Sequence, residues 1–244
     1  MKPKILHFKE ISSTQDKAKE LAKKGISSAI VVANLQSKGR GRLGRRWHSG
    51  NGGLWMSILL KPKDGKNTQY LTFIASIAVA ESIKKIAELD AKIKWPNDIH
   101  MNGKKLCGIL TEGVFGNESF LVVGIGLNVN QKRFADDIKK TATSLCILCN
   151  KAFDKKIFLE DISRRFFSMH EKFFISKKFE IILEKWKKNS DTIGKDAIVS
   201  SKKGEFKGRV VGIGRDCSLL LKDGKNKTTR ILEGDVSVRY EQLR

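Results

Sequence analysis

Four arginines and three glycines share the nine residues "GRGRLGRRW", from Gly39 to Trp47. Arginine presents a planar fork of donors that matches the oxygen atoms of a phosphate or a carboxylate in pairs. Glycine lets backbone N–H groups approach an anion closely, and the face of Trp47 can stack on a base. The stretch is typical of a loop that binds nucleic-acid phosphates or a small phosphorylated intermediate. The structural alternative is an exposed basic loop that ends in a core tryptophan.

A second group of charged residues is "KWPND", from Lys94 to Asp98, where Pro96 ends an expected strand. Lys94 is a point charge suited to a phosphate. Asp98, with Asn97 beside it, supplies hard oxygen atoms that suit Mg²⁺ or a polar ligand group. The structural alternative is a turn in which Asp98 caps the next element.

Two stretches that contain glycine follow. In "KKLCGIL", Lys105 precedes an expected strand and Gly108 lies within it, where a glycine lets a ligand come close. In "GIGLNVN", a glycine turn is expected to present Asn128 to a sugar or a phosphate. This is not a dinucleotide fingerprint, because Val129 stands at the third glycine position. A solvated hairpin lysine and an ordinary turn are the structural alternatives.

The sequence shows no signature of a catalytic nucleophile. The histidines at positions 7, 48, 100 and 170 are dispersed, and Cys146-x-x-Cys149 has no second pair that would complete a metal site. Reduced cysteines in a reducing cytoplasm are the favoured interpretation. The sequence therefore favours a reaction in which side chains position charged phosphate groups over one with a covalent enzyme intermediate.

The chain has 244 residues and a formal net charge of +22. The excess is mostly lysine spread along the whole sequence, which favours a solvated surface over a dedicated nucleic-acid face. The N-terminus has no apolar run typical of a signal peptide, and the most apolar segment, residues 70–89, is interrupted by polar and charged residues. We expect a cytoplasmic protein that does not enter a membrane.

The pattern of apolar residues predicts an α+β fold in two parts. Strands are expected at 5–8, 29–34, 54–60 and 91–95, and residues 119–130 are expected to form a strand that runs into a glycine turn. Helices are expected at 12–25, with Ser/Thr at the cap, at 68–88 and between 134 and 190, and a hairpin at Asn102–Gly103. About five short alternating strands follow from Ile193. We therefore expect a catalytic domain with a mixed sheet and helices over 1–190 and a small SH3-like β-barrel over 191–244.

Four motifs taken together are more specific than any one of them. "SSTQD", "QSKGRGRLGRRW", "KWPNDIHMNGKKLCGIL" and "GIGLNVN", in this order and spacing, closely resemble the biotin–protein ligases, also called biotin–[acetyl-CoA-carboxylase] ligases. The resemblance covers nearly the whole chain, down to the ending "LEGDVSVR". Some members of that family carry an N-terminal helix-turn-helix domain. Because "ISSTQD" begins at Ile11 in this chain, the resemblance implies the form that has the ligase part without that DNA-binding domain. The alternatives are a lipoate or octanoate ligase or transferase of the same fold, and a basic nucleic-acid-binding protein.

The resemblance implies a reaction in two steps. ATP, with Mg²⁺, activates biotin to biotinyl-5′-AMP, and a lysine of a biotin carboxyl carrier protein domain, of acetyl-CoA carboxylase or a similar enzyme, then takes the biotin. Cations must bring a carboxylate and a triphosphate together, and a loop must shield the anhydride from water. The expected partners include no specific DNA and no membrane, and a homodimer is one possible assembly.

The resemblance also assigns roles to residues. It implies biotin contacts at Ser13, Thr14, Gln15, Gln36, Arg40, Gly41, Arg42, Lys105 and Gly108, although many relatives have asparagine where this chain has Gln15. It implies nucleotide contacts at Arg40, Arg42, Trp47, Lys94, Asn97 and Asn128, and a weaker one at Arg239. It implies catalytic roles for Arg42, Lys94, Asp98 and Lys105, with Asp98 also near Mg²⁺.

Overall fold

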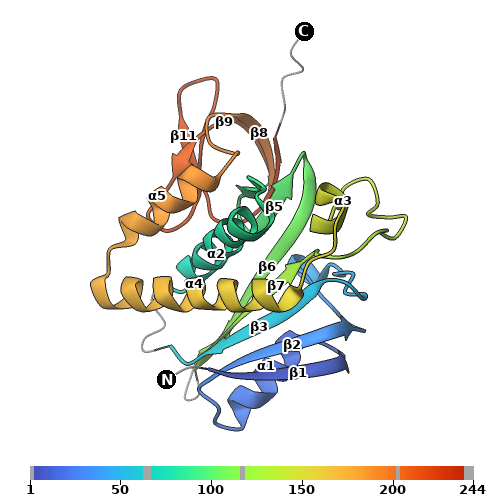
Figure 1. Cartoon of the computed structure of the whole chain (residues 1–244). Coiled ribbons are helices and arrows are strands. Elements are labelled where there is room, and N and C mark those ends of the chain that lie inside the picture. Colours follow the sequence, from blue (N-terminus) through green and yellow to red (C-terminus); the bar gives the residue numbers. More distant parts are fainter. Residues whose placement is uncertain (1–2, 63–66, 116–118, 202–203, 239–244) are drawn as a thin grey trace.

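The structure, a computed structural model, describes residues 3–62, 67–115, 119–201 and 204–238. Its centre is a seven-stranded mixed sheet in the order β1-β2-β3-β7-β6-β5-β4 (Figure 1). Strands β1 and β2 are parallel, and every other neighbouring pair in this sheet is antiparallel. In chain order the strands are β1 (Lys4–Ile11), β2 (Ser28–Gln36), β3 (Leu54–Leu60), β4 (Lys92–Lys94), β5 (Asp98–Met101), β6 (Lys104–Val114) and β7 (Phe120–Leu127).

Helices cover both faces of this sheet. One face carries α1 (Thr14–Lys23), and the opposite face carries α2 (Tyr70–Ala87), α4 (Lys155–Ser176) and α5 (Phe179–Asn189) (Figure 1). The short helix α3 (Leu145–Cys149) lies between β7 and α4 in the sequence. The α+β prediction for the catalytic part is confirmed by this mixed sheet with its helices.

The two faces follow from the alternation of side chains along each strand. On β2, Ile30 and Val32 belong to the large core beneath α2, whereas Ala29 and Val31 pack with Ala18 of α1. Strands β3 and β7 alternate in the same way. Helix α1 packs on the first half of β2 and of β7 and on the second half of β3. It therefore covers only one half of this face of the sheet, and none of the described α-helices covers the other half.

Two local signals act as the sequence predicts. The side chain of Ser13 caps α1, where its Oγ accepts a hydrogen bond from the backbone N–H of Asp16 at 3.3 Å. Asn102 and Gly103, with φ of 52° and 74°, form the hairpin turn between β5 and β6. This hairpin brings Asp98 and Lys105 onto neighbouring strands.

The expected glycine turn at 124–126 is wrong. Gly124 and Gly126 lie inside β7, where Gly124 is paired in register with Leu110 and Gly126 with Gly108 of β6. The strand continues through both glycines because β3 and β6 supply ladder partners on its two sides. Lys105, expected before the strand, also lies within β6. A glycine inside a paired strand is a sign of close approach by another group, not of a turn.

A second sheet of five strands follows α5, in the order β11-β10-β9-β8-β12. Its apolar side chains belong to the same buried core as α2 and α5, and the indole of Trp95 donates to the carbonyl of Cys217 at 2.9 Å. The SH3-like barrel and the boundary at residue 190 stay predictions. The strands are β8 (Asp196–Ser201), β9 (Gly204–Ile213), β10 (Leu219–Lys222), β11 (Thr228–Ile231) and β12 (Asp235–Val238).

None of the helices in the described parts of the chain is long and apolar enough to cross a membrane.

Candidate active site

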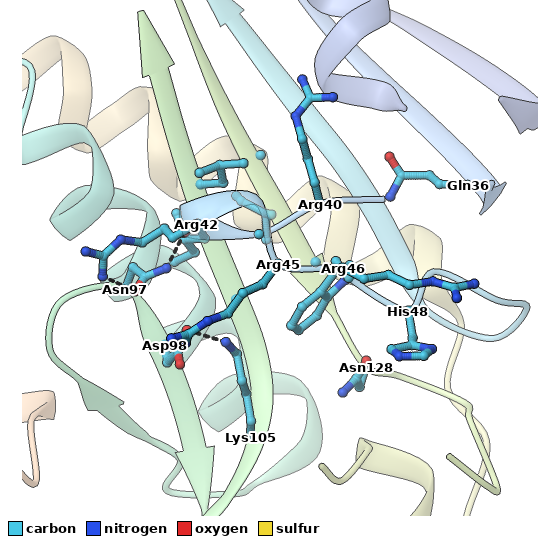
Figure 2. A pocket seen from close by; sticks show the side chains of 18 of the residues that line it. Gln36, Arg40, Arg42, Arg45, Arg46, His48, Asn97, Asp98, Lys105 and Asn128 are labelled. Carbon is cyan, nitrogen blue, oxygen red and sulfur yellow. Dashed lines mark hydrogen bonds and ion pairs between the residues drawn. The ribbon is translucent and has the colours of Figure 1, made fainter. Parts of the chain in front are cut away.

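A cavity of about 230 Å³ lies on the sheet face that α1 leaves uncovered. Its floor is formed by β6 and β7, one wall by the start of α1, and its cover by the loop between β2 and β3. Figure 2 shows the arginines of that loop above the strands that carry Asp98 and Lys105. The segment from Phe134 to Ala142 closes another side. The basic loop of the sequence and the glycine-containing strands therefore share one site.

The inner end of the cavity is a cluster of polar side chains. The backbone N–H of Thr14 donates to Gln36 Oε1 at 2.7 Å, and Thr14 Oγ1 lies 2.8 Å from Ser57 Oγ. Ser57 donates to Gln15 Oε1 at 3.0 Å. Thr14, Gln15 and Ser57 are buried, so the cluster offers fixed hydrogen-bonding groups away from bulk water. Such an end suits the polar part of a small ligand.

Arg40 is held at the α1 side of the cavity. Its guanidinium forms a bidentate ion pair with Asp16, in the first turn of α1, and lies 3.7 Å from Glu112 of β6. In Figure 2 its side chain extends away from the Asp98–Lys105 pair. Two carboxylates thus orient one arginine beside the polar cluster.

Arg42 and Arg45 connect the loop to other parts of the chain. Arg42 Nη1 donates to Asn97 Oδ1 at 3.1 Å and lies 3.5 Å from the carbonyl oxygen of Gly234. Asn97 is fixed in turn, because its Nδ2 donates to the carbonyl of Ile109 at 2.6 Å. Arg45 forms an ion pair with Asp235 of the second sheet. The loop is therefore fastened at both the "KWPND" turn and β12.

Lys105 and Asp98 form an ion pair in the cavity wall, with Nζ 2.7 Å from Oδ1 (Figure 2). Burial by itself would raise the pKa of the Asp98 carboxyl, but the His100 imidazole and the Lys105 ammonium together hold that pKa below its usual range. Asp98 is therefore ionised at neutral pH and fixes the lysine ammonium in the wall.

Trp47 lies flat on the glycine floor. A Cβ atom on Gly126 would come within 2.4 Å of Trp47 Nε1, and one on Gly108 within 3.1 Å of Trp47 Cζ3. Lys105 Nζ lies 5.1 Å from the centre of the indole. The glycines of β6 and β7 are therefore required by the close approach of the tryptophan ring. Its Nε1 is buried and has no hydrogen-bond partner among the described residues.

The structure brings most of the expected site residues together. Of the expected residues that the structure describes, all except Lys94 line the cavity: Ser13, Thr14, Gln15, Gln36, Arg40, Gly41, Arg42, Trp47, Asn97, Asp98, Lys105, Gly108 and Asn128. Lys94 is paired with Asp98 in the β4–β5 ladder but does not line the cavity. Arg239 is outside the described residues. The roles of all these residues stay predictions.

Asn128 has a clear structural function. Its Nδ2 donates to the carbonyl of Thr143 at 3.0 Å, and its Oδ1 accepts from Gln131 Nε2 at 3.1 Å. Its backbone N–H donates to the carbonyl of Leu106 at 2.9 Å. Asn128 therefore holds the segment 141–143 against β6 and β7 while it lines the cavity.

Sequence reasoning missed several lining residues. Ser57 could have been found, because it is the one polar residue within the apolar run "LWMSILL". Gly124 and Gly126 could also have been found as part of the floor, because two glycines two residues apart in a strand leave room for another group. Asp235 and Phe134 gave no local signal, because they reach the cavity from distant parts of the chain. Arg45 and Arg46 belong to the expected loop but received no role of their own. The missed lining residues include His48, Ser57, Gly124, Gly126, Phe134, Ile138 and Asp235.

The comparisons with known proteins place this fold among the ligases that join a small carboxylic acid to a protein. The chain belongs to the biotin/lipoate A/B protein ligase family, whose model matches residues 7–130. Within the family, the chain is similar to biotin protein ligases, which confirms the resemblance that its motifs indicate.

Three comparisons define that similarity. The chain is 34% identical to the bifunctional ligase/repressor BirA of Bacillus subtilis (strain 168) over 241 residues, which cover 96% of this chain and 74% of the relative. It is 36% identical to a biotin–[acetyl-CoA-carboxylase] ligase of Paracoccus denitrificans over 121 residues, or 48% of this chain and 50% of the relative. The biotin protein ligase from Aquifex aeolicus in complex with biotin and ATP aligns with a TM-score of 0.86 and 33% identity, covering 97% of this chain and 98% of the other.

Proposed function

We propose that this cavity binds biotin and ATP side by side and that the chain is a biotin–[acetyl-CoA-carboxylase] ligase. One observation carries the proposal: the polar cluster around Thr14 and the cations of the loop and of Lys105 line the same cavity. The polar cluster suits the ring of biotin, and the cations suit its carboxylate and the phosphates of ATP. Named relatives with this activity and a solved relative that contains both ligands support the assignment.

In the first step, an oxygen of the biotin carboxylate attacks the α-phosphorus of ATP. A new C–O–P linkage forms, the bond from the α-phosphorus to the bridging oxygen breaks, and pyrophosphate leaves with the electron pair. The carboxylate and the triphosphate repel each other, so the reaction needs cations between them. We assign this role to Arg40, Arg42 and Lys105, which line the cavity and whose positive charges would stabilise the negative charge that develops on the phosphoryl oxygens.

In the second step, the neutral amine of a carrier-protein lysine attacks the carbonyl carbon of the mixed anhydride. An amide bond forms, the C–O bond to the phosphate breaks, and AMP leaves with the electron pair while the amine loses a proton. Asp98 is ionised and lies in the cavity wall, where its charge suits the orientation of the incoming amine. The loop and Trp47 shield the anhydride from water before the carrier arrives.

The described residues contain no group of three or more His, Cys, Asp or Glu side chains that could hold a metal ion. In the cavity, Asp98 is already paired with Lys105 and Asp235 with Arg45. Mg²⁺ would instead enter with the ATP phosphates, which supply most of its oxygen ligands in such complexes. Contact of that ion with Asp98 stays a prediction.

The protein partner that we propose is a biotin carboxyl carrier domain, of acetyl-CoA carboxylase or a similar enzyme. This follows from the second step, which needs a protein lysine as acceptor. The absence of specific DNA binding, a homodimeric state and a cytoplasmic location stay predictions.

The test is biotin-dependent exchange of labelled pyrophosphate into ATP, which reports the first step alone. Exchange with biotin, followed by transfer of biotin to a purified carrier domain, is the expected result. Lipoate in place of biotin is the matched control, because the same fold serves both ligand classes. Exchange with lipoate and none with biotin would replace the proposal by a lipoate ligase, and no exchange with either would reject both.

A further inference from the structure

The inner wall of the cavity contains a chain of hydrogen bonds that has a definite direction. It runs from Thr14 through Ser57 and Gln15 to Glu112, from α1 across β3 to β6. A side-chain amide or hydroxyl can be oriented in more than one way, so its direction must be deduced from neighbours that only donate or only accept.

Gln15 has such neighbours. Its Nε2 lies 2.9 Å from Glu112 Oε2 and 3.1 Å from the carbonyl oxygen of Leu110. Both atoms only accept, so the amide NH₂ must face them and the amide oxygen must face the opposite way. That oxygen lies 3.0 Å from Ser57 Oγ. Ser57 therefore donates its single hydroxyl proton to Gln15.

The direction continues to Thr14. Because the Ser57 proton is already used, Ser57 can act only as an acceptor in its 2.8 Å contact with Thr14 Oγ1. A second acceptor, Gln36 Oε1, lies 3.0 Å from the same Thr14 hydroxyl. The orientation of Gln36 is fixed as well, since its Oε1 accepts from the Thr14 backbone and its Nε2 donates to Ser49. Whichever acceptor takes it, the Thr14 proton stays within the protein.

These side chains consequently offer lone pairs, and no protons, to a ligand. Thr14 Oγ1 and Ser57 Oγ are left as acceptors on the wall of the cavity. The Ser13 hydroxyl, which lines the same end, accepts from the N–H of Asp16 at 3.3 Å, and its own proton has no acceptor among the described residues. A ligand that satisfies this end must bring hydrogen-bond donors, such as N–H groups, and a carbonyl on it can accept from Ser13.

We propose that Glu112 is the positioning residue that fixes this direction and so selects a ligand with N–H donors beside a carbonyl, a cyclic urea. The carbonyl oxygens of Leu110 and Val122, 3.1 and 3.4 Å from Gln15 Nε2, already favour the observed orientation of Gln15. The Glu112 carboxylate makes the reversed orientation far less favourable, because the amide oxygen would then face a negative charge. The inference rests on the proposed function: biotin contains a cyclic urea, whereas the dithiolane ring of lipoate has no N–H donor.

Glu112→Gln tests the inference, because an amide at position 112 can donate to Gln15 as well as accept from it. Calorimetry without ATP should show biotin binding about tenfold weaker, with a smaller preference of biotin over lipoate. Lys19→Met is the matched control, since Lys19 lies 3.1 Å from the same carboxylate but outside the chain. It should leave biotin binding within about twofold of the wild type. Unchanged binding by Glu112→Gln would overturn the inference.

A double-mutant cycle separates positioning from a general structural effect. Glu112 acts on the ligand through Gln15 and Ser57, so Glu112→Gln should add little once Ser57→Ala has removed that link. The double variant should therefore bind biotin about as tightly as the single variant with the lower affinity. If Glu112 acted through Arg40, which is 3.7 Å away, or through stability, the two losses would multiply and the inference would fail. A wild-type chain that binds no biotin would instead contradict the proposed function.

Discussion

Lys105 Nζ lies 2.7 Å from Asp98 Oδ1 across the β5–β6 hairpin and 5.1 Å from the centre of the Trp47 ring. A carboxylate on one strand and an indole on the loop therefore hold the same cation. The tight Asn102–Gly103 turn places the two charged residues on adjacent strands. The lysine is thus held in the cavity wall by the protein itself, so the catalytic role that we propose for it would need little further ordering.

Replacement of that cation should impair adenylate formation. We expect Lys105→Met to lower biotin-dependent pyrophosphate exchange about 100-fold or more, because one fixed charge near the phosphates is lost. Lys104→Met is the matched control, since Lys104 is exposed and does not line the cavity. Equal activity of the two variants would show that the Lys105–Asp98 pair is structural.

Arg42→Ala should stop the first step without unfolding the chain. Arg42 contributes charge to the cavity and contacts Asn97 and Gly234, yet it is only half-buried. We expect adenylate formation to fall about 100- to 1000-fold, with an unchanged thermal unfolding midpoint. Lys38→Ala, an exposed change in the same loop, should keep full activity. Normal turnover by Arg42→Ala would remove this residue from the site.

Elements with strong local signals could be predicted from the sequence. Strand β3 has the predicted bounds, Leu54–Leu60, because it is a continuous apolar run ended by Lys61-Pro62. The cap at Ser13 and the Asn102–Gly103 turn depend on residues close in sequence. The site residues within the quoted motifs were found for the same reason.

Features that depend on distant residues could not be predicted in this way. The glycines at 124 and 126 looked like a turn, because nothing nearby in the sequence shows that Trp47 will lie on them. The ion pair between Arg45 and Asp235 joins residues 190 positions apart. Such contacts depend on how the second sheet packs, which no local pattern encodes.

Substitutions of Trp47 or of a glycine beneath it should weaken ATP binding more than biotin binding. We expect Trp47→Ala to weaken ATP binding more than biotin binding, because it removes the flat surface that suits adenine. Gly126→Ala should produce the same asymmetry, since its methyl group would displace the indole. Calorimetry with each ligand alone provides the measurement. Equal losses for both ligands would mean that Trp47 serves only to pack the core.

A separate cluster should control stability and leave the chemistry unchanged. The side chain of Asp161 is 7% exposed and lies within 3 Å of Lys85, Arg165 and Ser82. We expect Asp161→Asn to lower the free energy of unfolding by about 3 kcal/mol, because it removes the buried carboxylate that pairs with the half-buried Arg165 guanidinium and with the Lys85 ammonium. Activity well below the unfolding temperature should stay normal, since none of these residues lines the active-site cavity.

The pH dependence of that loss gives an independent check. Burial would raise the pKa of Asp161, but Arg165 and Lys85 lower it far more, so the folded state holds its pKa below the usual value. The carboxylate therefore stabilises the fold fully above about pH 4, the ordinary pKa of an unfolded aspartate, and less as the pH falls towards the lowered value. The stability gap between wild type and Asp161→Asn, measured by denaturant unfolding, should be constant from about pH 7 to 5 and narrow below about pH 4. A gap that widens on acidification would show that Asp161 is protonated in the folded chain and that the cations around it are not its counter-charges.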